Sequence, residues 1–146
     1  MRYQLEAHIS RLRIPTSAAP ARADELWRHT CFEAFIADSA SVYYELNLSP
    51  SSQWALYRFD DYRQGMSTAD LATPPAISVR SSDYRLELDA SLHLEELADL
   101  RSEGSLRVAL SAVIEAEDGR LSYWALRHPS EKPDFHHADG FVSVSR

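Results

Sequence analysis

The sequence predicts an all-β protein: a single antiparallel β-sandwich of about nine strands with one short helix. Apolar residues recur mostly at every second position, which is the periodicity of strands with one buried face. Pro, Ser, Asp and Gly interrupt these runs at short intervals, as turns do in antiparallel sheets. Two packed sheets with inward apolar faces are therefore favoured, and a partly closed barrel is the alternative.

Nine segments have the strand pattern. They lie at about residues 2–9, 31–37, 42–48, 53–59, 76–80, 83–89, 105–116, 120–127 and 140–145. The strongest turn signal is Asp118-Gly119, which supplies the positive φ angles of a tight hairpin and predicts that the segments on either side pair. Residues 38–41 (DSAS) predict a second short loop between antiparallel neighbours.

Residues 91–104 (SLHLEELADLRSEG) predict the helix, because Leu92, Leu97 and Leu100 approximate a helical stripe between a Ser91 cap and Gly104. Residues 21–27 (ARADELW) predict a single helical turn before the strand at residue 31.

Composition excludes several classes of protein. The 146 residues fit one domain, 1–146, and 45% of them are hydrophobic, enough for a sizeable core. A net charge of -7 without a Lys/Arg cluster argues against nucleic-acid and membrane-surface partners. No apolar segment predicts a signal peptide or a membrane span, and Cys31 is the only cysteine, so a cytoplasmic location is expected.

Missing motifs also exclude functions. With only four glycines there is no phosphate-cradling loop and no dinucleotide fingerprint. A G-x-S-x-G nucleophile elbow is also missing. Nucleotide and serine hydrolysis are therefore not expected.

The segment YYELNLSP (residues 43–50) carries Glu45 and Asn47 on the face opposite its core-facing residues, so that polar face is either a wet surface or the floor of a binding site. Glu33 lies on the expected neighbouring strand. The two glutamates could form an acid and base pair for glycoside hydrolysis, or could be structural carboxylates paired to Arg28 or Arg58.

Other reactive side chains have ordinary explanations. His128, His136 and His137, with Asp134 among them, suggest zinc, but their spacing matches no compact ligand motif and a proline-rich loop is the simpler interpretation. Cys31 is typical of a small apolar strand residue. Trp27, Trp54 and Trp124 lie beside polar groups, so each is either a core residue or an aromatic platform for a sugar ring.

Three blocks in order, LWRHTCFEAFIA, YYELNLSPSSQWALYRFDDYRQGM and YWALRHPSEKPDFHH, resemble the DOMON-like bacterial proteins related to family 9 carbohydrate-binding modules. The resemblance covers roughly Tyr3 to Phe141. It implies a jelly-roll-like β-sandwich from a superfamily that binds haem or sugars, and it informs the fold more than the activity.

The resemblance also implies site residues. Trp27, with Glu33 six residues later, is similar to one side of a two-tryptophan sugar clamp, with Trp124 as the other side and Asn47 and Arg58 as hydroxyl partners. His29 and Thr30 stand where relatives often have acidic residues, which argues against calcium. For a haem with Met and His axial ligands, the chain offers only Met1 and Met66. In the resemblance, relatives carry one or two strands ahead of the block at Arg2, so the chain is expected either to be a shortened version of the fold or to start downstream of its natural beginning, which would leave a sheet edge open.

The sequence therefore predicts a non-catalytic module that binds a saccharide or another small molecule and needs no cofactor. The expected ligand-binding residues are Trp27, Arg28, His29, Glu33, Glu45, Asn47, Arg58, Trp124 and His128. A sandwich that binds a protein partner without a small ligand is the first alternative, and a haem or metal carrier is the second.

Overall fold

The computed structural model describes residues 1–38, 41–100 and 105–145, which form ten strands in two antiparallel sheets. The strands are β1 (Arg2–Glu6), β2 (Cys31–Ala37), β3 (Tyr43–Leu48), β4 (Trp54–Phe59), β5 (Ser67–Thr68), β6 (Ala76–Ser81), β7 (Arg85–Ser91), β8 (Ser105–Glu115), β9 (Leu121–Ala125) and β10 (Val142–Ser145). The all-β prediction is confirmed, and each of the nine predicted strands is present. β5 was missed because a two-residue strand carries no periodicity.

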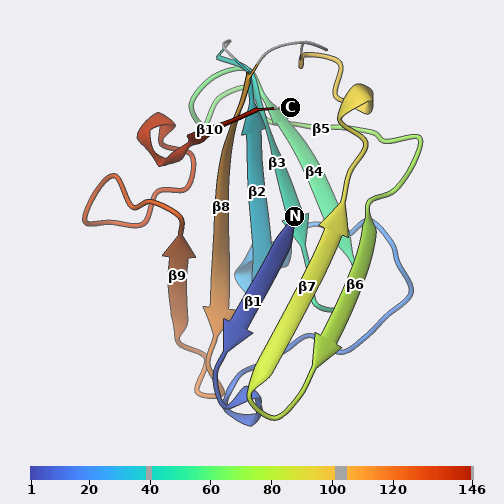
Figure 1. Ribbon diagram of the computed structural model, residues 1–146, viewed down its shortest axis with the longest axis vertical. Coiled ribbons are helices and arrows are strands. Elements are labelled where there is room, and N and C mark those ends of the chain that lie inside the picture. Colours follow the sequence, from blue (N-terminus) through green and yellow to red (C-terminus); the bar gives the residue numbers. More distant parts are fainter. Residues whose placement is uncertain (39–40, 101–104, 146) are drawn as a thin grey trace.

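The two sheets differ in size. The smaller has the order β1-β7-β6, and the larger has the order β10-β8-β2-β3-β4-β5, with β9 also paired to β8. Figure 1 shows the three-stranded sheet lying across the front of the larger one, with β9 beyond its β1 edge. One face of the larger sheet is thus covered by a sheet, and β9 extends past that cover.

The main core lies between the sheets. Alternate residues of the central strands point into it, among them Phe32 and Ile36 of β2 and Leu46 of β3, where they meet Leu86 and Leu88 of β7. Removing this apolar surface from water supplies the main driving force for folding. We call this side of the larger sheet its inner face.

The opposite side of the larger sheet, its outer face, is also buried. A second apolar cluster forms there around Phe35, Tyr43 and Tyr57, and Leu26, Phe135 and Phe141 pack onto it from two connecting segments. One is the 3₁₀ turn η2 (Leu26–Arg28); the other, residues 126–141, joins β9 to β10 and contains the 3₁₀ turn η4 (Ala138–Gly140). This double cover explains why every residue of β2 and β3 is buried.

The predicted helix at residues 91–104 is wrong within the described residues. There the chain forms only the 3₁₀ turn η3 (Leu94–Glu96), and Leu97 returns to an extended conformation. Leu97 is fully buried in the main core, and Glu96 accepts hydrogen bonds from the backbone N–H groups of Ala72 and Thr73. These contacts override the helical preference of the leucine-rich sequence. Residues 101–104 lie outside the described residues.

Both predicted hairpins are confirmed by their strand pairing. β8 pairs with β9 around Gly119, whose φ of 85° is left-handed, and β2 pairs with β3. Residues 39–40 of the second loop lie outside the described residues. The predicted turn before β2 is the 3₁₀ turn η2; another, η1 (Ile9–Arg11), follows β1.

None of the helical turns in the described part of the chain has the length and apolar character that a membrane span requires.

Candidate functional site

Glu33 lies at the centre of the outer face. Its strand, β2, pairs Glu33 with Asn47 of β3 on one side and with Ser111 of β8 on the other. The Ser111 hydroxyl donates a hydrogen bond of 3.1 Å to the Glu33 carboxylate, and the residue is only 3% exposed. Burial, and then the neighbouring Glu45 charge, raises the pKa of Glu33 to about 8. A carboxyl group here is therefore neutral at neutral pH.

Glu45 and Asn47 share this face because they are two residues apart on β3. The Asn47 amide donates to the Glu45 carboxylate at 2.9 Å, and Glu45 is 7% exposed. Burial raises the pKa of Glu45, while the Asn47 hydrogen bond and the Arg63 charge oppose the shift. Register places Glu45 opposite Phe35, so the two glutamates are diagonal neighbours on adjacent strands.

Residues 126–141 cover one end of this polar group. Asp134 binds the Arg63 guanidinium at 3.0 Å and also accepts a hydrogen bond from the Tyr62 hydroxyl. His136 is hydrogen-bonded to the Tyr43 hydroxyl at 2.7 Å, and its other ring nitrogen lies 3.7 Å from the Glu45 carboxylate. Burial lowers the pKa of His136 to about 4, so the imidazole is neutral at neutral pH. These contacts hold the segment against the sheet.

Trp27 belongs to the second covering segment. η2 lies against β2 and β3, and Leu26 packs into the outer-face cluster, whereas Trp27 remains 45% exposed. The Arg28 guanidinium lies 5.2 Å from the centre of the Trp27 ring. The segment therefore presents a solvent-accessible aromatic ring on the same side of the sheet as Glu33 and Glu45.

A small cavity adjoins Ser111 beneath the covering segment. Its volume is about 10 Å³, room for about one water molecule. It is lined by Ala109, Leu110, Ser111, Ala125, Arg127, Asp134, Phe135 and Gly140. The polar group is thus packed rather than open, and the space beside Ser111 is too small for a sugar ring.

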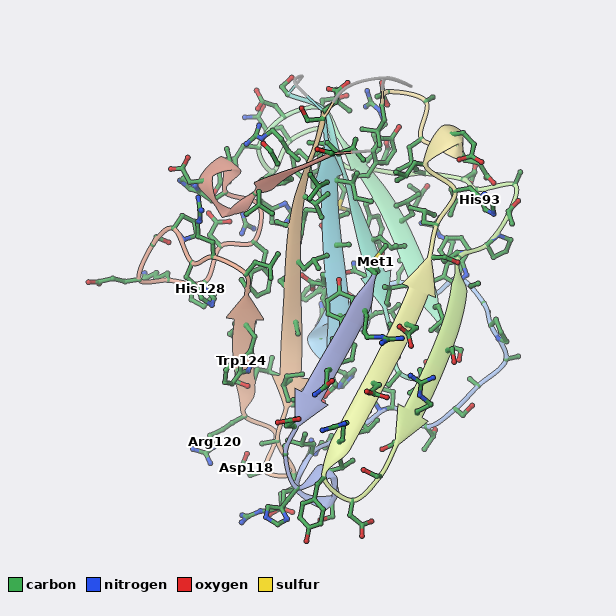
Figure 2. All side chains as sticks on the ribbon, viewed as in Figure 1. Met1, His93, Asp118, Arg120, Trp124 and His128 are labelled. Carbon is green, nitrogen blue, oxygen red and sulfur yellow. The ribbon has the colours of Figure 1, made fainter. Side chains whose placement is uncertain are left out.

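The structure brings Trp27, Glu33, Glu45 and Asn47 to the outer face but separates Arg58 and Trp124 from them. Arg58 pairs with Tyr44 on the inner face and binds Asp99 at 2.7 Å. Trp124 pairs with Ala112, an inner-face residue, and is 61% exposed because β9 extends beyond the smaller sheet. Figure 2 marks Trp124 on β9. Trp27 and Trp124 therefore lie on opposite sides of the larger sheet and cannot contact the two faces of one sugar ring in this structure.

The remaining predicted site residues have protein partners at the edge of the outer face. Arg28 forms an ion pair with Glu25, and the His29 ring binds the Glu115 carboxylate at 2.7 Å. His128 lies beyond the end of β9 (Figure 2), with its ring centre 6.4 Å from that of Phe135. None of these three hydrogen-bonds to Glu33 or Glu45.

Metal ligation finds little support in the donor groups. The Thr30 hydroxyl donates to the Arg13 carbonyl, and His29 is engaged with Glu115, so this position does not offer the set of oxygen ligands that calcium takes. No group of three or more His, Cys, Asp or Glu side chains in the described ranges is placed to hold a metal ion. Met66, one of the two methionines considered as haem ligands, is exposed to solvent. Burial raises the pKa of the Cys31 thiol, which disfavours the thiolate form that binds metals.

Sequence reasoning missed the outer-face roles of Tyr43, Ser111, Asp134 and His136. Ser111 gave a usable signal, because it is a polar residue in the otherwise apolar run VALSAVI and β8 is predicted as a strand. The other contacts depend on how residues 126–141 fold back, which no local pattern specifies.

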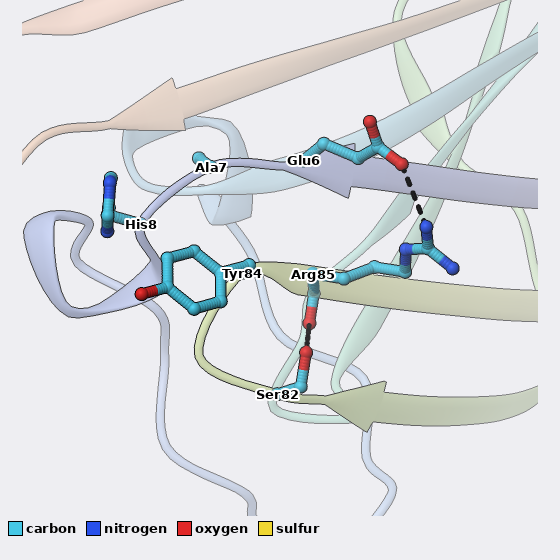
Figure 3. Close-up of a pocket in the computed structure, with 6 residues that line it drawn as sticks. All are labelled: Glu6, Ala7, His8, Ser82, Tyr84 and Arg85. Atoms are coloured by element: carbon cyan, nitrogen blue, oxygen red, sulfur yellow. Dashed lines mark hydrogen bonds and ion pairs between the residues drawn. The ribbon is translucent and has the colours of Figure 1, made fainter.

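A second hollow lies on the smaller sheet. It has a volume of about 530 Å³, is widely open to solvent, and is lined by Glu6, Ala7, His8, Ser82, Tyr84 and Arg85 (Figure 3). Its polar groups bond to one another: Arg85 binds Glu6 at 3.0 Å, and the Ser82 hydroxyl donates to the Arg85 carbonyl. Because its charges are already paired in solvent, we regard the outer-face polar group as the stronger candidate site.

Comparison with known proteins supports the fold. No protein-family model matches the chain, and no curated protein matches it. One solved structure with a similar fold is that of a putative carbohydrate-binding protein from Bacteroides uniformis. The TM-score is 0.66 at 12% sequence identity, and the match covers 99% of this chain and 69% of the other. At this identity the similarity shows a shared β fold, like that of the Bacteroides protein.

Proposed function

We propose that this protein is a non-catalytic module that binds a saccharide, or a similar hydroxyl-rich small molecule, on the outer face of its larger sheet. The observation that carries the proposal is the buried polar group of Glu33, Ser111, Glu45 and Asn47 on the side where Trp27 is exposed. Carboxyl and amide groups can bond sugar hydroxyls, and an aromatic ring can hold the C–H face of a sugar.

The fold is consistent with this function. The similar Bacteroides structure is that of a putative carbohydrate-binding protein, and the DOMON-like resemblance of the sequence implies sugar-binding relatives. Both arguments rest on fold, which hosts different functions, so the site residues must carry the test.

Binding is favoured over glycoside hydrolysis by the electrostatics of the two glutamates. An acid and base pair needs pKa values that are pushed apart. Here burial raises the pKa of both Glu33 and Glu45. Neither carboxyl group therefore has the lowered pKa that would favour an ionised nucleophile or base at its position. The cytoplasmic location expected from the sequence stays a prediction.

The test is calorimetric titration of the purified protein with glucose, xylose, cellobiose and other oligosaccharides. Trp27→Ala should weaken binding roughly tenfold, the loss expected from an aromatic contact of about 1.4 kcal/mol. Trp124→Ala is the matched control, because it also removes an exposed tryptophan but on the inner face. Equal effects of the two variants, or no binding of any saccharide, would contradict the proposal.

A further inference from the structure

Glu33 and Glu45 lack a positively charged partner among the residues that the structure describes. Glu33 accepts from the Ser111 hydroxyl, and Glu45 accepts from the Asn47 amide; both donors are neutral. In the part of the chain that the structure describes, the basic side chain within ion-pair distance of either is His136, 3.7 Å from Glu45, and burial lowers its pKa to about 4. The Arg63 guanidinium is directed to Asp134 instead.

Other carboxylates of the protein are paired differently. Glu115, at the edge of the same face, binds both Arg13 and His29. Asp99 binds Arg58, and Asp134 binds Arg63. Within residues 1–38, 41–100 and 105–145, arginines thus bind carboxylates near the surface, whereas none forms an ion pair with either glutamate at the centre of the candidate site.

A buried carboxylate without a counter-ion is costly, and the usual response of the group is to stay protonated. A bound ammonium group would supply the missing charge and a strong charge-assisted hydrogen bond. A neutral sugar hydroxyl supplies only the hydrogen bond. The two glutamates are diagonal neighbours on adjacent strands, so one ammonium group placed between them could serve both.

On this basis, which rests on the proposed function, we propose that the site selects amino sugars: its ligand is a saccharide with a free, protonated amine that binds between Glu33 and Glu45. Trp27 then contacts the sugar ring, and Asn47 and Ser111 bond to the carboxylates or the hydroxyls. Residues 126–141 must move for the amine to reach the glutamates.

Binding of the ammonium group is coupled to loss of carboxyl protons. The titratable groups that share the outer face with Glu33 and interact with its charge are Cys31 on its own strand and Glu45 on β3. The Tyr3 hydroxyl of β1 lies on the inner face and donates to the Glu33 backbone carbonyl. Glu45 is flanked by Arg63, His136 and the Tyr43 hydroxyl, and Tyr57 of β4 lies directly opposite it. Because burial raises the pKa of both glutamates, the amine must displace their protons in acid, and its affinity should rise with pH until the free amine itself loses its proton.

The experiment compares glucosamine, N-acetylglucosamine and glucose by calorimetric titration of the full chain at several pH values between about pH 5.5 and pH 7.5. Glucosamine should bind about tenfold or more tightly than either neutral sugar at the upper pH. Its affinity should fall as the pH is lowered, whereas that of glucose should change little. Glu33→Gln, which keeps the shape and mimics the protonated acid, should remove the preference, and Glu6→Gln on the smaller sheet should keep it.

The outcomes separate the two proposals. If glucose or N-acetylglucosamine binds as tightly as glucosamine, the amino-sugar preference is overturned and saccharide binding stands. If glucosamine is preferred but Glu33→Gln and Glu45→Gln leave the preference unchanged, the placement of the amine is overturned. If none of the three sugars binds, both proposals lose their support.

Discussion

The protonation of Glu33 can be measured without any ligand. The perturbation is Glu33→Gln, which replaces a buried carboxyl group with a neutral amide of nearly the same shape. The Gln side chain can still accept the Ser111 hydrogen bond, so the packing of the outer face should be retained. What changes is the ability of residue 33 to lose a proton.

The sign of the effect follows from the raised pKa. Burial moves the pKa of Glu33 from an ordinary value of 4.5 to about 8 in the folded protein. Between these values the folded protein binds one more proton than the unfolded chain, so its free energy of unfolding falls as the pH rises. The contribution of this carboxyl group is complete below the unfolded pKa and is lost as the pH rises through the folded one.

The size of the change in the free energy of unfolding with pH is set by the one proton that the folded and unfolded chains bind differently at Glu33. One proton difference changes the free energy of unfolding by at most about 1.4 kcal/mol per pH unit, or about 3 kcal/mol between pH 5.5 and pH 7.5. For a chain of this length, that corresponds to a change of melting temperature on the order of 10 °C. Glu45 and His136 also titrate differently on folding, but they are present in both proteins and largely cancel in the comparison.

The assay is urea denaturation of the wild-type and Glu33→Gln proteins at closely spaced pH values across this range. The wild-type protein should lose stability relative to the variant as the pH rises. Two parallel stability profiles would refute the reasoning, because they would mean that Glu33 has the same pKa in the folded and unfolded chains.

Three further predictions test the fold and the covering segment. Gly119→Ala should lower the free energy of unfolding by about 1 kcal/mol in urea denaturation, because the φ angle of 85° at Gly119 is unfavourable for alanine. Gly140→Ala is the control and should change the free energy of unfolding little, because φ at Gly140 is ordinary and an added Cβ would lie 3.7 Å from the nearest atom, the Arg127 carbonyl oxygen. Leu46→Ala should cost about 2–5 kcal/mol in the same assay, since Leu46 is fully buried between the sheets; a loss below 1 kcal/mol would contradict that packing. Asp134→Ala should speed amide hydrogen exchange in residues 126–141 roughly tenfold, since hydrogen bonds from Arg63 and Tyr62 are lost, and unchanged exchange would show that those bonds do not hold the segment.

The alternation of side chains was sufficient to predict the strands and the sharing of one face by Glu45 and Asn47. It placed Glu33 on the neighbouring strand but could not give the register that sets it between Asn47 and Ser111. It also could not show that this face is buried, because the cover comes from η2 and residues 126–141, which have no periodic pattern. Leu97 illustrates the reverse case: its helical spacing was real, but packing against the sheets decided its conformation.

Trp124 and Arg58 show that motif order alone does not determine which face of a sheet a residue lies on. Each of the two residues was expected on the same face as the glutamates. Side chains alternate between the two faces of a strand, so a shift of one residue in the register moves a side chain to the opposite face. Register places both on the inner face, and Arg58 is engaged by Asp99. By contrast, Trp27 lies on the outer face because η2 packs against that side of β2 and β3 and is not part of the sheet.

The most direct test of the account is an NMR titration of ¹⁵N-labelled protein with glucosamine and glucose, following every backbone amide. We predict that the shifted amides cluster at residues 26–37, 43–48 and 126–141, which form the outer face and its cover. Shifts confined to the smaller sheet, around Tyr84, would place the ligand at the open hollow instead, and the absence of shifts with either sugar would contradict saccharide binding at the outer face.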